Sequence, residues 1–167
     1  MIRIGRLTSS DRASAGVYDD LSGPEIEKAL TVFFAGEEIE WRRVVQPDER
    51  AALEAALSDL VDRERCRLVV TTGGTGPNRR DVTPEATRAV LELELPGFGE
   101  IMRTRTFDVA PTAILSRATA GVRRACLIVN LPGRPSAVGE CLAVLGPAIK
   151  KALELLEPEY RESCPQP

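Results

Sequence analysis

The chain has 167 residues and 43% hydrophobic content, enough to bury one substantial core, so we expect a single domain. Its formal net charge of -3 argues against nucleic-acid binding, which depends on a net basic face. No apolar run approaches the roughly 20 residues of a membrane-spanning helix. Because the first residues also lack a signal-peptide pattern, the expected location is the cytoplasm.

Histidine is absent from the sequence, and no two cysteines form a C-x-x-C pair. Zinc sites and histidine-based catalytic triads are therefore excluded as expectations. Nucleotidyl or phosphoryl transfer is favoured over acyl transfer, since it needs mainly positioning and a metal rather than a general base. We interpret the cysteines as small buried or incidental residues; they are Cys66, Cys126, Cys141 and Cys164.

Strands and helices alternate along the chain without internal repeats. Short β-branched runs indicate the strands, and apolar residues at helical spacing indicate the helices. Ser22 and Glu25 have the spacing of a capping box, and Gly146 predicts a break between the last two helices. In chain order we expect a strand at 2–8, a polar loop at 9–16, a helix at 22–34, a strand at 39–46, a helix at 49–63, a strand at 68–72, a helix from 84, helices at 98–107 and 113–118, a strand at 125–131, and helices at 137–145 and 147–156.

This alternation predicts a three-layer α/β/α domain with a mostly parallel central sheet, over residues 1–156, followed by a short tail at 157–167. Ligands of such sheets bind beyond the carboxyl ends of the strands. The segments that leave strands at those ends are 9–16, 72–81, 130–136 and the turn at Asp48. The geometry allows these segments to form one shared pocket.

The segment 68–85 carries the strongest functional signal. A strand that is expected to be buried on both faces ends in Gly73, Gly74 and Gly76. Glycines let backbone N–H groups approach a ligand and form a concave nest for phosphate oxygens. The dinucleotide fingerprint and the P-loop motif both fail here, because Arg79 replaces the third glycine of the former and the latter lacks its Gly-Lys-Ser/Thr ending.

Charged residues follow the glycines. Arg79 and Arg80 offer forked donors that match phosphate geometry, and Asp81 is expected to stay ionised and to hold a divalent cation. The alternative is a simple glycine turn in which Thr83 caps a helix, Pro84 takes its first position and the arginines are solvated. Because that alternative leaves the three glycines and the Arg-Arg-Asp cluster unexplained, an anion site is favoured.

Asp48 has two interpretations. As the residue before a helix it is an ordinary N-cap, which the sequence alone favours. The functional alternative pairs it with Asp81 as a ligand set for Mg²⁺ on a phosphate substrate. Asp11 and Arg12 are similarly open, since they belong either to an exposed loop or to a substrate contact.

Several ordered motifs together resemble the MogA/MoaB family of molybdopterin adenylyltransferases over nearly the whole chain. They are Ser-Asp-Arg-Ala-Ser at 10–14, Pro-Asp-Glu at 47–49, Thr-Thr-Gly-Gly-Thr-Gly-Pro at 71–77, Arg-Arg-Asp-Val-Thr-Pro-Glu-Ala at 79–86, Pro-Gly-Phe-Gly-Glu at 96–100, Pro-Thr-Ala-Ile-Leu-Ser-Arg at 111–117 and Asn-Leu-Pro-Gly-Arg-Pro at 130–135.

The resemblance implies a homotrimeric enzyme that transfers AMP from MgATP to the terminal phosphate of molybdopterin and releases pyrophosphate, before a partner enzyme inserts molybdenum. It implies that Asp48 and Asp81 are catalytic aspartates that hold Mg²⁺. The expected contacts of the nucleotide and phosphates are Thr72, Gly73, Gly74, Thr75 and Gly76. The expected wall residues of the pterin and nucleotide pockets are Ser10, Asp11, Ser116, Arg117, Pro132, Gly133 and Ser136.

Two other functions stay open at this point. One is a non-catalytic homologue that stores or delivers molybdopterin. The presence of Asp48 and Asp81 argues against this function. The other is a different nucleotide-using enzyme on the same fold, such as a hydrolase of a pyrophosphate bond, because a shared fold does not fix function. Adenylyl transfer fits a protein without histidine, since an attacking phosphate is already an anion and needs no general base.

Overall fold

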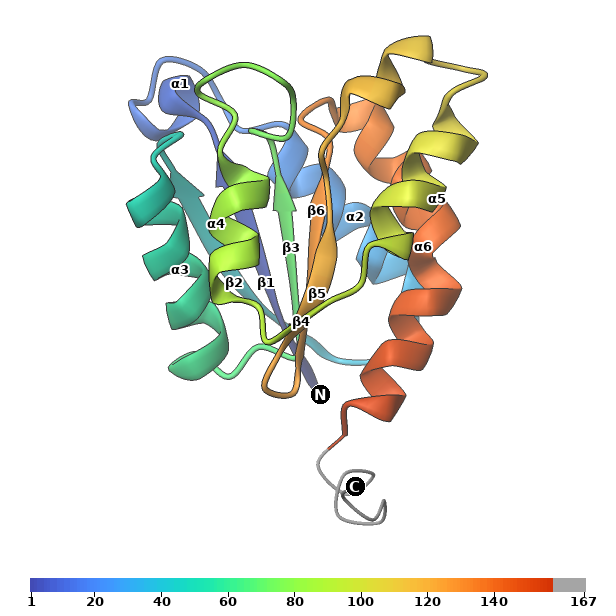
Figure 1. Cartoon of the computed structure of the whole chain (residues 1–167). Coiled ribbons are helices and arrows are strands. Elements are labelled where there is room, and N and C mark those ends of the chain that lie inside the picture. The colour runs from blue at the N-terminus through green and yellow to red at the C-terminus, as the bar shows by residue number, and fades with distance from the viewer. Residues whose placement is uncertain (158–167) are drawn as a thin grey trace.

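The computed structural model describes residues 1–157, which contain a six-stranded sheet with helices on both faces (Figure 1). The strand order is β2-β1-β3-β6-β5-β4. The elements are β1 (Ile2–Ser9), α1 (Asp11–Ser14), α2 (Ser22–Phe33), β2 (Ile39–Gln46), α3 (Arg50–Asp62), β3 (Leu68–Thr72), α4 (Thr83–Val90), β4 (Leu93–Glu94), α5 (Gly97–Thr106), the 3₁₀ helix η1 (Pro111–Leu115), β5 (Ala120–Arg123), β6 (Cys126–Leu131) and α6 (Pro135–Leu155).

The sheet is mostly parallel. Strands β2, β1, β3 and β6 run in one direction, while β5 and β4 form an antiparallel edge. The sequence analysis missed both β5 and β4. Strand β4 has only 2 residues and both are exposed, and β5 has only 4 with a glycine among them, so neither shows a periodic pattern.

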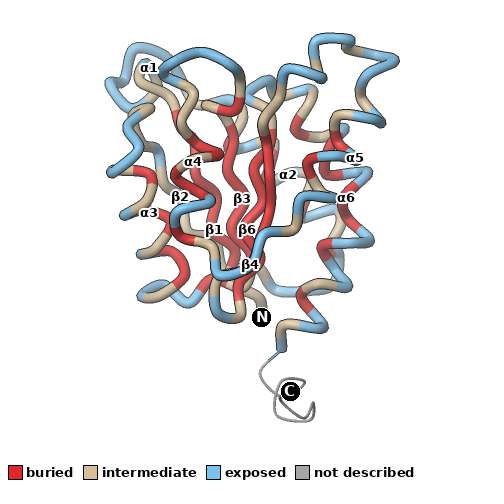
Figure 2. The backbone as a smooth tube through the Cα atoms, in the orientation of Figure 1, coloured by how far each residue is buried: buried red, intermediate tan, exposed pale blue. Residues whose placement is uncertain are grey.

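Helices cover both faces of the sheet and make the three expected layers. On one face, α2, α5 and α6 pack over Ile4, Leu68 and Val129. On the other face, α3 and α4 pack over Val69 and Ile128. Figure 2 shows that the central strands β1, β3 and β6 are buried along most of their length. The predicted three-layer α/β fold is confirmed, whereas residues 158–167 of the expected tail lie outside the described chain.

The predicted break at Gly146 is wrong, because α6 runs without interruption from Pro135 to Leu155. A Cβ on Gly146 would lie 2.3 Å from a ring carbon of Phe33 in α2. The glycine therefore marks a close approach of two helices. Pro147 stays inside the helix, since its neighbours Leu145 and Ile149 are anchored in the core.

The residues that cap the first turns of α2 and α1 also differ from the prediction. Ser22 does not cap α2, because its hydroxyl donates to the backbone oxygen of Gly133 at 2.7 Å; Asp20 instead accepts from Gly23 N at 2.9 Å. The expected loop at 9–16 contains α1, which Ser10 caps by accepting from Ala13 N.

Two further helix starts differ from expectation. Thr83 is the first residue of α4 rather than its cap, and its hydroxyl has no partner among the described residues. The helix expected at 113–118 is the 3₁₀ turn η1, which ends at Leu115. The chain then extends because the backbone N–H of Arg117 donates to Thr75 O at 2.8 Å.

The described cysteines confirm the interpretation as small buried residues, since Cys66, Cys126 and Cys141 are free and buried. Cys164 lies outside the described residues. Burial raises the pKa of the Cys66 thiol to about 12 and that of Cys141 to about 11; burial also raises the pKa of Cys126. Within residues 1–157, no helix combines the length and apolar character needed to cross a bilayer.

These raised thiol pKa values predict that the three cysteines resist alkylation in the folded protein. At about pH 8, a thiol with so high a pKa is almost entirely protonated, and the thiolate is the reactive form. Mass spectrometry after a short iodoacetamide pulse should find Cys66, Cys126 and Cys141 unlabelled natively and labelled in urea. Native labelling of Cys66 at the rate seen in urea would contradict the packing described here.

Candidate functional site

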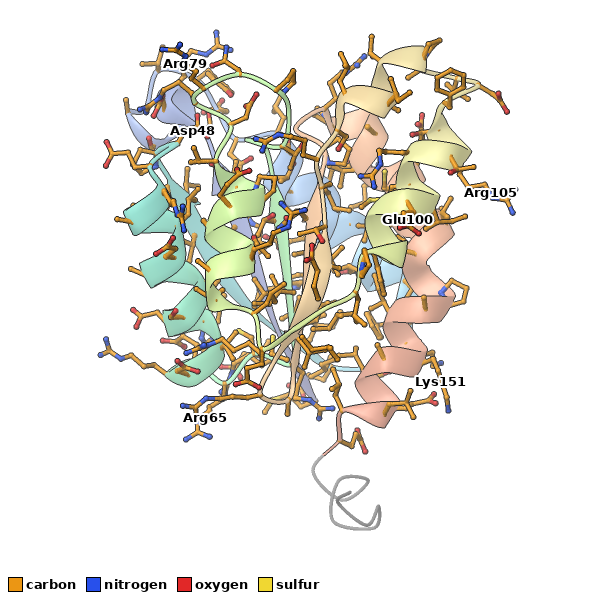
Figure 3. All side chains as sticks on the ribbon, viewed as in Figure 1. Asp48, Arg65, Arg79, Glu100, Arg105 and Lys151 are labelled. Atoms are coloured by element: carbon orange, nitrogen blue, oxygen red, sulfur yellow. The ribbon has the colours of Figure 1, made fainter. Side chains whose placement is uncertain are left out.

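The carboxyl ends of four parallel strands meet at one edge of the sheet. Thr8 in β1 is in register with Val45 in β2 and with Thr72 in β3, and Thr72 is in register with Leu131 in β6. The loops that follow these strands therefore share one edge, as the sequence predicted. Figure 3 shows Asp48 and Arg79 at this edge of the molecule.

The glycine loop that follows β3 needs glycine for steric reasons. Gly73 has a φ of +89°, and a Cβ on it would lie 2.3 Å from the backbone oxygen of Ser9. Gly74 has a φ of +62°, and its Cβ would lie 2.4 Å from Thr83 Oγ1. A Cβ on Gly133, from the loop after β6, would lie 3.3 Å from Gly73 Cα. Three loops thus pack backbone against backbone around Gly73.

The side chain of Asp48 is held by residues 9–16, at and after the end of β1, which we call the first loop, and not by the start of α3. Its Oδ1 accepts from Ser9 Oγ at 2.6 Å, and its Oδ2 accepts from Asp11 N at 3.1 Å. The backbone N–H of Asp48 donates back to Asp11 Oδ1 at 3.0 Å. Because α3 begins only at Arg50 and has no side-chain cap, the N-cap interpretation of Asp48 is wrong.

Asp81 lies at the other end of the glycine loop. Its Oδ2 accepts from Asn78 N at 2.9 Å and lies 2.8 Å from where a Cβ of Gly76 would be. Asp48 Oδ1 lies 3.3 Å from the corresponding position on Gly74. The two aspartates, far apart in sequence, therefore flank the same short loop. Asp48 lies beside Gly74, and Asp81 lies beside Gly76.

The arginines near this loop have different surroundings. Arg80 donates to both carboxylate oxygens of Asp11, at 2.6 to 3.0 Å, and these bonds lower the pKa of Asp11. Arg117 donates to Gly76 O at 2.9 Å and to Asp81 O at 2.6 Å, and it also pairs with Glu85. Arg117 thereby fixes both ends of the loop, a role its sequence position did not reveal.

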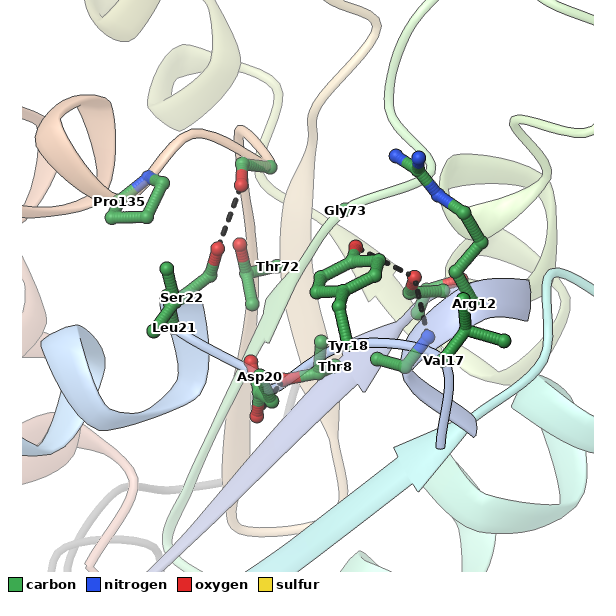
Figure 4. Close-up of a pocket in the computed structure, with 14 residues that line it drawn as sticks. Thr8, Arg12, Val17, Tyr18, Asp20, Leu21, Ser22, Thr72, Gly73 and Pro135 are labelled. Carbon is green, nitrogen blue, oxygen red and sulfur yellow. Dashed lines mark hydrogen bonds between the residues drawn. The ribbon is translucent and has the colours of Figure 1, made fainter. Parts of the chain in front are cut away.

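Two cavities open beside the contact between Gly73 and Gly133. The Tyr18 cavity has about 470 Å³ and lies between the first loop, α2 and Gly73 (Figure 4). The Ser116 cavity has about 560 Å³ and lies between the glycine loop, η1 and the start of α6. Gly133 lines both of them. Two ligands placed one in each cavity would thus meet at the glycine loop.

Comparison with known proteins identifies the family of this architecture. The family described as a probable molybdopterin binding domain matches residues 5–151. The chain belongs to this family. It is 48% identical over 161 residues to a molybdopterin adenylyltransferase of Helicobacter pylori strain J99, covering 96% of this chain and 91% of that protein. The resemblance to the MogA/MoaB family is confirmed.

Other relatives agree with this membership. A molybdopterin adenylyltransferase of Escherichia coli K12 is 45% identical over an alignment of 181 positions. The alignment covers 99% of this chain and 90% of that protein. The structure of the molybdopterin biosynthesis Mog protein from Mycobacterium ulcerans matches with a TM-score of 0.85 at 35% identity, covering 94% of this chain and 100% of the other.

Most site residues expected for this family line one of the two cavities. The Tyr18 cavity is lined by Ser10, Thr72, Gly73 and Gly133, and the Ser116 cavity is lined by Thr75, Gly76, Ser116, Pro132, Gly133 and Ser136. Asp11, Asp48, Gly74, Asp81 and Arg117 line neither. Asp11 and Arg117 instead hold Asp48 and Asp81 in place through the bonds described above.

The sequence analysis missed a buried ion-pair group beneath the Tyr18 cavity of this family member. Arg6, which is 8% exposed in the middle of β1, donates to Asp20 Oδ2 at 2.5 Å and to Glu27 Oε1 at 2.8 Å. Asp20 also accepts from Thr8 Oγ1 at 2.9 Å and lines the cavity. An arginine within an otherwise buried strand was the available signal, because such a residue requires carboxylate partners.

Proposed function

We propose that this chain transfers AMP from MgATP to the terminal phosphate of molybdopterin, giving adenylated molybdopterin and pyrophosphate. The observation that carries the proposal is the pair of cavities that meet at a glycine loop flanked by Asp48 and Asp81. A reaction between two phosphate esters needs this arrangement, since both phosphates must reach one point while their ring systems stay apart.

The residues around the loop fit Mg²⁺. Asp48 Oδ1, Ser9 Oγ and the unpartnered, fully buried Thr83 Oγ1 surround the position that a side chain on Gly74 would fill. Within the described residues, no group of three or more acidic or cysteine side chains is placed to hold a metal ion. We therefore infer that Asp48 and Asp81 hold the cation together with substrate oxygens, as Mg²⁺ sites on phosphates commonly do.

Bound there, Mg²⁺ would supply positive charge that reduces the repulsion between the two phosphates. The chain itself positions the reactants. Gly73 and Gly133 keep the space between the two cavities free of side chains. Arg117 holds the backbone of Gly76 and Asp81 at fixed positions, so the catalytic carboxylate is preorganised before substrate binds.

The relatives favour catalysis over storage. Proteins at 45% and 48% identity over nearly the whole chain are named molybdopterin adenylyltransferases. The proposal is also supported by the position of both aspartates beside the glycine loop. Assembly into a homotrimer, residence in the cytoplasm and handover of the product to a molybdenum insertase belong to the same proposal and rest on the family resemblance.

Release of pyrophosphate tests the proposed function. The purified chain, incubated with ATP, Mg²⁺ and molybdopterin, should release pyrophosphate only when all three are present. A molybdopterin carrier would release none. A hydrolase of the pyrophosphate bond would act without the pterin, so pterin-independent product would contradict the proposal as directly as no product at all.

A further inference from the structure

A third cavity lies beside the residues that follow the glycine loop. This Arg79 cavity has about 480 Å³ and is lined by Arg50, Arg79, Arg117, Asp81 and Glu85, among others. It adjoins the Ser116 cavity at Pro77, which lines both. Arg50 belongs to the first turn of α3, just after Asp48. The cavity is therefore framed by chain segments that adjoin both catalytic aspartates.

Only some of its charges are available to a ligand. Arg117 is fully engaged by the loop backbone and by Glu85. Arg80, next along the chain, lies outside the lining and is held by Asp11. Arg79 is exposed and has no hydrogen-bond or ion-pair partner in the part of the chain that the structure describes. Arg50 pairs with Glu54 through Nε alone, and 58% of its side chain is exposed.

We propose that the Arg79 cavity binds the pyrophosphate end of ATP and the pyrophosphate that is released, with Arg79 as its main contact and Arg50 as the second. The inference rests on the proposed function and assigns the leaving group of that reaction to a site. A free guanidinium beside the loop matches this ligand, because its planar donors bind phosphate oxygens in pairs.

The reaction itself requires a separate place for this group. An oxygen of the attacking phosphate bonds to the α-phosphorus of ATP as the bond from that phosphorus to the bridging oxygen breaks. The electron pair leaves with pyrophosphate, and attacking and leaving oxygens lie on opposite sides of the phosphorus. The leaving group cannot share the cavity of the attacking phosphate. The Arg79 cavity is lined by Asp81 but not by Gly73 or Gly133, and is thus separate from the place where the other two cavities meet.

Titration with inorganic pyrophosphate in the presence of Mg²⁺ tests the assignment by calorimetry. We expect the wild-type chain to bind pyrophosphate and Arg79→Gln to bind it about tenfold more weakly or worse, as expected for loss of charge-assisted hydrogen bonds. Arg79→Lys should keep part of the affinity. The matched control is Arg63→Gln, which removes an exposed arginine just after α3 that pairs with Asp59 and should bind pyrophosphate like the wild type.

Two results would overturn the assignment: a wild-type chain that does not bind pyrophosphate, and an Arg79→Gln variant that binds it as tightly as the wild type. The Michaelis constant for ATP gives a second readout and should rise in Arg79→Gln while that for molybdopterin stays the same. Failure of the proposed function can be told apart from failure of this assignment. In the former case the wild-type chain forms no adenylated molybdopterin, whether or not it binds pyrophosphate.

Discussion

Asp81→Asn is expected to lower the rate of adenylyl transfer by about 10²-fold or more, the scale seen when one preorganised electrostatic group is removed from an active site. The variant loses the charge that we propose for holding Mg²⁺, yet asparagine keeps an oxygen that can accept from Asn78 N as Asp81 Oδ2 does. The fold should therefore survive. Pyrophosphate release under saturating substrates measures the rate, and urea denaturation measures the stability.

Asp59→Asn is the matched control, because it removes a carboxylate of the same type that, among residues 1–157, pairs only with Arg63 on the exposed side of α3. It should keep full activity. Because Asp59 is exposed, Asp59→Asn should keep the free energy of unfolding within about 0.5 kcal/mol of the wild type, as for most surface substitutions. Asp81→Asn, at a half-buried position, should stay folded under the assay conditions. Normal turnover of Asp81→Asn would remove this residue from the catalytic site.

Gly73→Ala is expected to lower the free energy of unfolding by about 2–5 kcal/mol, from roughly 1–2 kcal/mol for a left-handed L-residue and roughly 1–3 kcal/mol for overpacking. Gly73 has a φ of +89°, and the new Cβ would lie 2.3 Å from the backbone oxygen of Ser9. Backbone cannot move aside as a side chain can, so the loops around the site must separate. Activity should fall with stability.

Gly36→Ala separates the two contributions. Gly36 has a φ of +95°, close to that of Gly73, but a Cβ on it would meet nothing within 4 Å. Its substitution should cost only the roughly 1–2 kcal/mol of the left-handed backbone. Equal losses for both variants would show that the close approach of Gly73 to Ser9 contributes nothing to stability.

The sequence predicted those parts of the fold that depend on a local pattern of residues. The buried run before Gly73 predicted a central strand, as the structure shows. The glycines were expected to let the backbone approach a ligand, and in the structure Gly73 also lies close to the backbone of Ser9. Alternation of elements predicted the layers. The shared edge of the strand ends then followed from the direction of a parallel sheet.

The predictions were wrong where the hydrogen-bond partner of a side chain lies far away in the sequence. Ser22 has the local spacing of a capping box, but its hydroxyl bonds Gly133, 111 positions away. Asp48 precedes a helix, but its carboxylate is held by Ser9 and Asp11. Side chains that can cap a helix can equally bond another loop, and only the tertiary structure selects between the two.

The neighbouring arginines make the same point at the site. Arg79 and Arg80 are equivalent in the sequence as phosphate donors, yet Arg80 is engaged by Asp11 while Arg79 faces an open cavity. Arg117 was expected to line a pterin or nucleotide pocket; it fastens Gly76 and Asp81 and also lines the Arg79 cavity. Which guanidinium is free depends on contacts between loops that are far apart in sequence.

The central claim is that Asp48 and Asp81 share one divalent cation at the glycine loop. A crystal of the wild-type chain with Mn²⁺ in place of Mg²⁺ and a non-hydrolysable ATP analogue tests it through the anomalous scattering of the metal. The account predicts an anomalous peak bonded to one carboxylate oxygen of each aspartate and to the nucleotide phosphates. A metal bound to the nucleotide with neither aspartate as a ligand would contradict it.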